Sequence, residues 1–279
     1  MTRTIMYPAL ISVAELATRQ AQQQPLIILD ARARLNDADA GQALWHEGHI
    51  PGAFHTDMDR DLSAPASARH GRHPLPAKEA FATRLREWGI TADDRVVVYD
   101  DNGGRLAAAR AWWLLRWAGH PAVQVLDGGW QAWLAAGQPI QTDTPLAKAS
   151  DWQPHFDDML IASAEDVAAG EALLLDARAA ERYRGEAEPL DPKAGHIPGA
   201  RNVPGSSLLQ KDHTFLPAAQ LQQQLPAAEN VIAYCGSGIS ACQLILGYAQ
   251  LERPLPRLYP GSWSAWSNDP QRPVATGDE

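Results

Sequence analysis

Cysteine is scarce in this chain: of its 279 residues, only Cys235 and Cys242 are cysteines. Two cysteines cannot build a disulfide framework, and their spacing fits neither a C-x-x-C redox pair nor a four-ligand zinc cluster. We therefore expect free thiols, no metal site, and a reducing setting, the cytoplasm.

Long apolar runs and an excess of positive charge are also missing. The most apolar stretch, residues 107–119, is interrupted by Arg110 and Arg116, so nothing approaches the roughly 18 uncharged residues of a transmembrane helix. The N-terminal segment lacks the apolar core of a signal peptide. Lys and Arg number 24 against 33 Asp and Glu, a net charge of −9 without a basic stretch. Nucleic acid and membranes are therefore not expected as partners.

What the chain does contain is the composition of a globular protein. Apolar residues make up 45% and charged residues 20% of the sequence, which excludes wholesale disorder. The length suits one large domain or two ordinary ones, and both halves are long enough to bury a core.

The sequence repeats itself across its two halves. Four blocks recur in the same order, among them the motifs D-A-R and G-H-I-P-G-A: residues 29–32 with 175–178, 48–53 with 195–200, 96–99 with 231–234, and 128–133 with 261–266. A period of about half the chain is too long for a solenoid, so it indicates two copies of one domain. We expect domains at residues 1–144 and 158–279, joined by a linker at 145–157.

Within each copy, short apolar runs alternate with segments of helical periodicity. The runs that read as buried strands include residues 26–29, 96–99, 173–175 and 231–234, and the helical segments include 105–119 and 239–251. This alternation predicts the α/β class, with two tandem domains that are each a mostly parallel sheet with helices on both faces. Such sheets bind ligands beyond the carboxyl ends of their strands, so we expect the site after Tyr99 or Tyr234.

A cysteine follows the second of these strands. Residues 235–241 read C-G-S-G-I-S-A, in which two glycines allow a tight loop and a helix begins near Ser240. Backbone N–H groups and the helix N-terminus then stabilise the thiolate of Cys235, the form that acts as a nucleophile. The alternative is a buried structural cysteine before a glycine turn. Copy one has Asp100 at the matching position, so the fold does not need sulfur there and we expect one site per chain.

The repeated blocks and the cysteine loop resemble the tandem rhodanese-type sulfurtransferases over nearly the whole chain. Residues 235–242, C-G-S-G-I-S-A-C, are similar to the mercaptopyruvate-type loop C-G-S-G-V-T-A-C and differ from it at Ile239 and Ser240. The resemblance implies two rhodanese-like domains, of which the second is catalytic. It also implies that Cys235 takes sulfur from 3-mercaptopyruvate as a persulfide and passes it to a thiol acceptor such as thioredoxin, or to cyanide. No cofactor is implied.

The loop residues are the first part of the expected substrate site: Gly236, Ser237, Gly238, Ile239 and Ser240. Their amides would stabilise the charge that moves through the persulfide, and the two serine hydroxyls could add donors. The alternative role of either serine is a helix N-cap. Thiosulfate-type relatives carry basic residues after the cysteine, whereas Gly236 and Ser237 are neutral. Mercaptopyruvate is therefore the favoured donor and thiosulfate the alternative.

The resemblance further implies an arginine for the donor carboxylate. The family places it in an R-[FY]-x-G segment before the second G-H-I-P-G-A, and Arg182 is the match. Its alternative role is that of a solvated surface arginine. Mercaptopyruvate-type members carry a second arginine in an E-P-R segment, where this sequence has Leu190. Lys193 or Arg201 could compensate for that loss.

A group for proton transfer is expected from the first copy. In mercaptopyruvate-type relatives a His and an Asp complete a Ser–His–Asp arrangement beside the cysteine, and the matching residues are His73 and Asp59, with Ser237 as the serine. Arg72 would add positive potential there. The alternative is a polar surface loop in which His70 and His73 face solvent.

Other repeated residues are expected to hold the fold together. His49 and His196 occur in the two G-H-I-P-G-A motifs with no second ligand at metal spacing, so each is expected to bond the backbone. The Asp–Arg pairs of the two D-A-R motifs recur although only one copy has the thiol, which indicates a structural role. Most of the repeated tryptophans are expected in the core.

Three other functions compete with sulfur transfer. A phosphatase of this fold needs Cys-x5-Arg, but Ala241 stands at the arginine position. A non-enzymatic persulfide carrier or thiol sensor would need Cys242 as a resolving partner, although Cys242 is expected to pack in the core. A binding module without catalysis would match the first copy. The physiological acceptor, the pathway and the oligomeric state are not indicated by the sequence.

Overall fold

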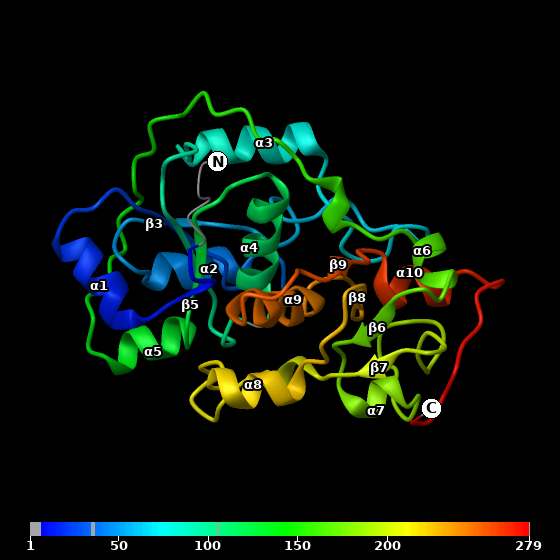
Figure 1. Ribbon diagram of the computed structural model, residues 1–279. Coiled ribbons are helices and arrows are strands. Elements are labelled where there is room, and N and C mark those ends of the chain that lie inside the picture. The colour runs from blue at the N-terminus through cyan, green and yellow to red at the C-terminus, as the bar shows by residue number, and fades with distance from the viewer. Residues whose placement is uncertain (1–6, 35–36, 105, 279) are drawn as a thin grey trace, which may run out of the picture. The chain divides into compact units, whose positions relative to one another are not determined.

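The computed structural model describes residues 7–34, 37–104 and 106–278 (Figure 1). The chain divides into two compact units: unit 1 comprises Met1–Leu62, Pro76–Asp157 and Lys211–Thr214, and unit 2 comprises Ser63–Leu75, Asp158–Gln210 and Phe215–Glu279. The boundaries expected from the repeat, 1–144 and 158–279, stay a prediction. The repeat does not reveal that Ser63–Leu75, which lies in the first half of the sequence, packs with unit 2.

Unit 1 is built around a five-stranded parallel sheet in the order β1-β5-β4-β2-β3. The strands are β1 (Leu10–Ile11), β2 (Ile27–Asp30), β3 (Ala53–His55), β4 (Val96–Tyr99) and β5 (Val123–Leu126). The helices are α1 (Val13–Ala21), α2 (Ala40–Glu47), α3 (Lys78–Glu87), α4 (Ala107–Trp117) and α5 (Gly129–Ala135). All four residues of β4 are buried, as expected of an apolar strand inside a sheet that is covered on both faces.

The two faces of this sheet are covered by different helices. Leu16 of α1 and Trp133 of α5 pack with Val97 and Tyr99 of β4 in one buried cluster. Helix α1 leads from β1 toward the β3 edge of the sheet, whereas α3 and α4 lead from β3 and β4 back toward the β1 edge. Because crossovers between parallel strands are right-handed, this reversal puts α3 and α4 on the opposite face from α1 (Figure 1).

Unit 2 has a four-stranded parallel sheet in the order β7-β6-β8-β9. The strands are β6 (Leu173–Asp176), β7 (Arg201–Asn202), β8 (Val231–Tyr234) and β9 (Arg257–Leu258). The helical elements are η1 (Asp158–Leu160), α6 (Ala164–Ala168), α7 (Ala180–Tyr183), η2 (Gly205–Leu208), α8 (Ala218–Gln224), α9 (Ala241–Gln250) and α10 (Ser262–Asn268). The two parallel sheets flanked by helices confirm the expected α/β class.

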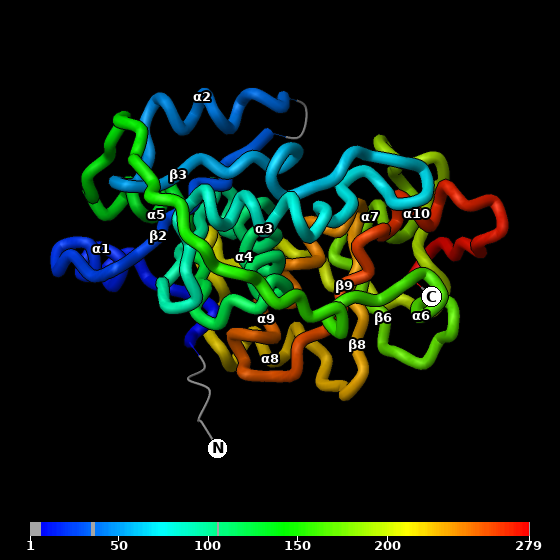
Figure 2. Tube along the Cα trace, turned by 90° about the horizontal axis from the view of Figure 1, so that it is seen from above, coloured from blue at the N-terminus to red at the C-terminus, as the bar shows by residue number. Residues whose placement is uncertain are grey.

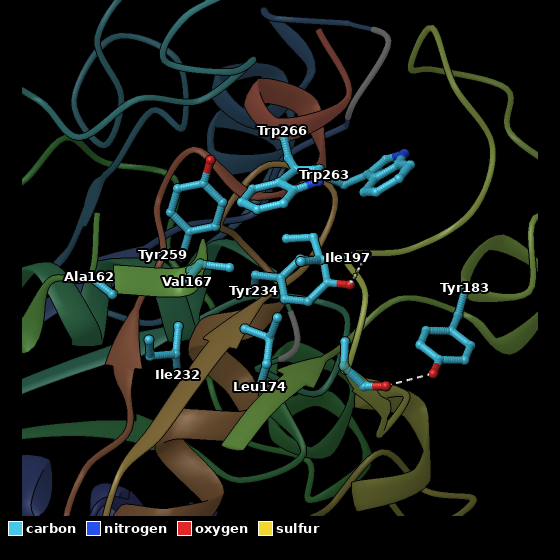
Figure 3. Close-up of a cluster of buried hydrophobic side chains, with 11 residues drawn as sticks. Ala162, Val167, Leu174, Tyr183, Ile197, Ile232, Tyr234, Tyr259, Trp263 and Trp266 are labelled. Carbon is cyan, nitrogen blue, oxygen red and sulfur yellow. Dashed lines mark hydrogen bonds between the residues drawn. The ribbon is translucent and has the colours of Figure 1, made fainter. Parts of the chain in front are cut away.

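One face of the second sheet carries an aromatic core. Leu174 of β6 and Tyr234 of β8 point toward Trp263 and Trp266 of α10 (Figure 3). The Tyr234 hydroxyl accepts the backbone N–H of Ile197 at 3.1 Å. This bond and the packing of the two tryptophans fix the carboxyl end of β8, which is the end that carries the cysteine.

The Asp–Arg pairs of the two D-A-R motifs are buried structural ion pairs. Arg178 donates from Nη2 to Asp176 Oδ2 at 2.6 Å and to the Gly195 carbonyl at 2.7 Å. In unit 1, Arg32 Nη2 donates to Asp30 Oδ2 at 2.7 Å and to the Gly48 carbonyl at 2.6 Å. Each pair thus ties a strand end to the G-H-I-P-G-A turn of its own unit, which confirms the structural role.

The two repeated histidines are also structural. His196 Nδ1 lies 2.8 Å from the Tyr183 carbonyl oxygen, and His49 Nδ1 lies 2.8 Å from the Trp45 carbonyl oxygen. Both rings are fully buried. Across the described residues, no group of three or more metal-ligating side chains is assembled, and none of the helices combines the length and apolar character needed to cross a bilayer.

Ser63–Leu75 forms a hairpin-like loop. Ser67 and Gly71 exchange backbone hydrogen bonds of 3.0 and 2.8 Å, and the Ala64 N–H donates to the Pro74 carbonyl at 3.0 Å. Gly71 has a φ of +87°, and a Cβ there would lie 2.7 Å from the Gly261 carbonyl oxygen. The loop therefore docks tightly against the start of α10, beside which Figure 2 shows it in cyan. This docking brings Arg72 and His73 into unit 2.

Candidate active site

Cys235 directly follows the buried strand β8 and is itself 2% exposed. Its backbone is held on both sides by the first turn of α10. The Cys235 N–H donates to Ser262 Oγ at 3.2 Å, and the Cys235 carbonyl accepts the Trp263 N–H at 2.9 Å. The position of the thiol is thus set by the sheet and by α10 together.

The loop after Cys235 turns back onto its sulfur atom. The Gly238 N–H donates to Cys235 Sγ at 3.2 Å, and Gly238 has a φ of +80°, in the left-handed region that favours glycine. Helix α9 begins at Ala241 with Ser240 at the N-cap position. A backbone donor on sulfur and a ten-residue helix starting at the end of the loop both stabilise negative charge there.

Ser262 is a site residue that sequence reasoning missed. Its φ is +52°, a strained value for serine, and its buried Oγ accepts the Cys235 N–H while donating to the Tyr259 carbonyl at 2.9 Å. The repeat does hold a signal, because the equivalent position in unit 1 is Gly129, with a φ of +58°. A serine where the other copy has a left-handed glycine indicates that its hydroxyl is needed.

His73 and Ser237 are brought together. His73 Nδ1 lies 2.8 Å from Ser237 Oγ, and Ser237 is 7% exposed. The Ser63–Leu75 loop thus delivers its histidine to a hydroxyl two residues after the cysteine, as a proton relay would require. Asp59 lies in unit 1, where its backbone N–H donates to Asp57 Oδ1 at 2.9 Å. Its role as the group that orients His73 stays a prediction.

Arg182 lies in a network of buried carboxylates. Its Nη2 donates to Glu188 Oε1 at 2.8 Å and approaches Asp191 Oδ2 at 3.3 Å. The other oxygen of Asp191, Oδ1, pairs with Arg72 Nη1. The Glu188 and Asp191 side chains are 4% and 2% exposed. One buried carboxylate therefore bridges two guanidinium groups that come from distant parts of the chain.

Both guanidinium groups lie against the cysteine loop. A Cβ on Gly236 would lie 3.0 Å from Arg72 Nη2 and 3.3 Å from Arg182 Nη1. The loop residues Gly236 and Ser237 are neutral, but their surroundings are not. Other segments of unit 2 therefore place two guanidinium groups beside the neutral loop, and each of them is paired with a buried carboxylate.

The remaining substrate candidates lie as follows. Ile239 is buried and Ser240 is partly exposed, and the Ser240 side chain makes no capping bond to α9. Lys193 Nζ donates to the Asp269 carbonyl at 3.1 Å, and Arg201 is exposed on β7. Leu190 is 54% exposed. Neither Lys193 nor Arg201, the two residues weighed as a second cation, is recorded beside Gly236; Arg72, expected only to add positive potential near His73, lies there instead.

Cys242 is fully buried in α9. Its Sγ donates to the Gly238 carbonyl at 3.4 Å, on the backbone of the same loop. The expectation that this cysteine packs in the core is confirmed. Its sulfur braces the residue whose N–H contacts Cys235.

The corresponding loop of unit 1 is filled by a carboxylate. Asp100 follows β4 as Cys235 follows β8, and its two oxygens accept backbone N–H groups from Asn102, Gly104, Leu106 and Ala108 at 2.9, 2.9, 3.3 and 3.1 Å. Burial raises the pKa of Asp100, and these N–H groups oppose the rise. In both copies the loop after the strand turns backbone N–H groups toward the side chain at this position: four donate to Asp100, and that of Gly238 donates to Cys235 Sγ.

Comparison with known proteins agrees with this geometry. Rhodanese-like domains match residues 12–136 and 162–269. A probable 3-mercaptopyruvate sulfurtransferase of Pseudomonas aeruginosa is 45% identical over 281 residues, covering 96% of this chain and 98% of the relative. A putative thiosulfate sulfurtransferase of Mycobacterium tuberculosis is 43% identical over 278 residues, covering 96% and 97%.

Among solved structures, SseA from Escherichia coli, a 3-mercaptopyruvate sulfotransferase, superimposes with a TM-score of 0.78 at 29% identity, covering 92% of this chain and 99% of that one. The agreement extends over both copies of the repeat. The chain therefore belongs to the rhodanese-like family and is a two-domain sulfurtransferase.

Proposed function

We propose that the protein moves a sulfane sulfur from 3-mercaptopyruvate, through a persulfide on Cys235, to a thiol acceptor such as thioredoxin or to cyanide. One observation carries the proposal: the loop that donates an N–H to Cys235 Sγ also has His73 hydrogen-bonded to Ser237 and two guanidinium groups against Gly236. A nucleophile, a proton relay and cations for a carboxylate are the groups that this donor requires.

In the first half-reaction the Cys235 thiolate attacks the sulfur of 3-mercaptopyruvate. The new S–S bond forms as the C–S bond breaks, and the electron pair of that bond leaves on carbon as the enolate of pyruvate. A proton from the Ser237–His73 pair converts the enolate to pyruvate. The loop amide that donates to Sγ stabilises charge on the sulfur before and after transfer.

In the second half-reaction an acceptor thiolate attacks the outer sulfur of the persulfide. The S–S bond breaks, its electron pair returns to Cys235, and the acceptor leaves as its own persulfide; cyanide would leave as thiocyanate. Because the chain needs Cys235 reduced at the end of each cycle, we place the reaction in a reducing compartment, the cytoplasm.

The donor must reach a sulfur that is itself buried. The side chains of Arg72 and Arg182 are 28% and 19% exposed, whereas Cys235 is 2% exposed. We propose that the donor enters past these two arginines. Asp59 is the sequence-based candidate for orienting His73 during proton transfer.

Intact-protein mass after incubation with 3-mercaptopyruvate tests the proposal. We expect wild type to gain one sulfur atom per chain, and Cys235→Ser to gain none. Cys242→Ser is the matched control and should still be labelled. Sulfur that is retained on Cys235→Ser would contradict the assignment, and the absence of labelling on wild type would contradict the donor.

Thiosulfate is the second candidate donor. The observation that favours it is the pair of guanidinium groups beside Gly236, whose N–H donors can also bind the oxygen atoms of thiosulfate. Side-by-side kcat/KM values for the two donors decide between them. We expect 3-mercaptopyruvate to give the higher value, since the Ser237–His73 pair serves the enolate, an intermediate that thiosulfate does not form.

A further inference from the structure

We propose that Arg72 is the second cation for the donor carboxylate, and that Asp191 is the residue that positions it opposite Arg182. The inference rests on the proposed function and names the residue that determines its specificity for a carboxylate-bearing donor. Arg72 comes from the Ser63–Leu75 loop, whereas the sequence resemblance places the family's second arginine at the position of Leu190.

The spacing of the two arginines is set by one carboxylate. Asp191 pairs through Oδ1 with Arg72 Nη1 and through Oδ2 with Arg182 Nη2. Its own position is fixed, because its backbone N–H donates to Glu188 Oε1 at 3.0 Å and its side chain is 2% exposed. Each guanidinium therefore has one edge tied to a buried anion, which leaves another edge for a ligand.

Those other edges meet at the cysteine loop. Arg72 Nη2 and Arg182 Nη1 lie 3.0 and 3.3 Å from the position that a Cβ of Gly236 would take, which is the residue next to the nucleophile. A carboxylate placed between the two guanidinium groups would accept from Arg72 Nη2 and Arg182 Nη1, the two nitrogen atoms that face Gly236.

Charge in the network also suits a monoanion. Asp176 neutralises Arg178, and Glu188 and Asp191 balance Arg182 and Arg72. A donor carboxylate therefore enters a site that offers oriented N–H donors rather than a large uncompensated charge. Such a site favours a ligand with the planar, bidentate geometry of a carboxylate.

The test compares two donors that differ only at this group. 3-Mercaptopyruvate carries the carboxylate, and 1-mercapto-2-propanone has a methyl group in its place. We expect Arg72→Gln to lower kcat/KM for 3-mercaptopyruvate by about 10–100-fold, the effect of a lost charged hydrogen bond, and to change that for the neutral ketone by less than about threefold. Arg69→Gln makes the same charge change three residues earlier, at an exposed position, and should leave both values unchanged.

Inhibition by pyruvate tests carboxylate binding separately from sulfur transfer, because pyruvate carries the carboxylate but donates no sulfur. Pyruvate should therefore inhibit turnover of the neutral ketone, with an inhibition constant that rises about 10–100-fold in Arg72→Gln. Asp191→Asn should raise KM for 3-mercaptopyruvate more than it lowers kcat, because it loosens both arginines without touching the sulfur. Arg72→Lys, which keeps the charge but not the bidentate fork, should recover part of the loss and serves if Arg72→Gln does not fold.

The outcomes separate this inference from the proposed function. If wild type forms no persulfide with either donor, the proposed function fails. If wild type is labelled but Arg72→Gln affects both donors equally, Arg72 only supports the loop and the inference is overturned. An unchanged constant for pyruvate inhibition would overturn it as well.

Discussion

At the scale of single residues, Ser262 links backbone strain to the position of Cys235. It holds a left-handed φ of +52° while its buried hydroxyl bonds the Cys235 N–H and the Tyr259 carbonyl. Strain of this kind costs about 1–3 kcal/mol and persists where the surroundings enforce it. The two buried hydrogen bonds of the hydroxyl therefore offset the free-energy cost of a backbone conformation that only glycine adopts without strain.

Two substitutions separate these contributions. Ser262→Ala removes both hydrogen bonds and keeps the strain, so we expect the free energy of unfolding to fall by about 2–3 kcal/mol. Ser262→Gly removes the same bonds but relieves the left-handed strain, so its loss should be smaller by about 1 kcal/mol. Urea denaturation followed by tryptophan fluorescence measures both. A glycine variant less stable than the alanine variant would contradict the strain argument.

Site residues that can be predicted from the sequence have partners nearby in the chain, whereas those that cannot be predicted have partners far away in the chain. Cys235, Ser237 and Gly238 lie in one short loop, so their spacing can be recognised in the sequence. Arg72 pairs with Asp191, which is 119 positions away. No local pattern encodes such a pairing, because it depends on where the Ser63–Leu75 loop docks.

At the scale of elements, the strand–loop–helix segments β4–α4 and β8–α9 share one backbone arrangement but place different side chains in the loop, Asp100 in the first and Cys235 in the second. Each strand is buried along its length, and each loop turns its amides inward. The repeat predicts these strands, and it predicts the start of α9 within a residue, because apolar periodicity and glycine positions are local properties. It does not predict that the Asp100 carboxylate accepts the N–H groups of the first loop.

Asp100 should therefore hold the first loop in place. Asp100→Ala would leave the buried N–H groups of Gly104 and Ala108 without their acceptor, so we expect a loss of about 2–4 kcal/mol in the free energy of unfolding. Asp100→Asn keeps one acceptor oxygen and should lose less. Sulfur transfer by the folded variants should be unchanged, and a loss of turnover with unchanged stability would contradict a structural role for Asp100.

At the scale of the whole molecule, duplication accounts for the architecture and divergence accounts for the function. The four repeated blocks predict two parallel sheets, because each block marks a strand end or a turn that both copies need. The assignment of Ser63–Leu75 to unit 2 could not be predicted in this way. It depends on the contact of Gly71 with the Gly261 carbonyl, a close approach that requires the folded α10.

The stability of the molecule should depend on pH through two histidines of unit 1, the buried His120 and the partly buried His55. His120 is 1% exposed; its Nε2 lies 3.0 Å from the Thr91 carbonyl oxygen, and its Nδ1 accepts the Ala122 N–H at 3.3 Å. This arrangement suits the neutral ring, since a proton on Nδ1 would face another N–H. Burial lowers the pKa of His120 below 6.5, and burial also lowers that of His55.

The direction of the effect follows from proton linkage. Below about pH 6.5 the unfolded chain binds protons at these histidines more readily than the native state does. The free energy of unfolding therefore rises with pH through this window, and it decreases as the pH falls. Each histidine contributes at most about 1.4 kcal/mol per pH unit. We expect urea denaturation at about pH 5.5 and 7.5 to show higher stability at the higher pH, and His120→Gln to reduce the difference. His46→Gln, at an exposed position, is the control and should leave the stability difference between the two pH values unchanged. If that difference is the same in His120→Gln as in wild type, His120 does not cause the pH dependence.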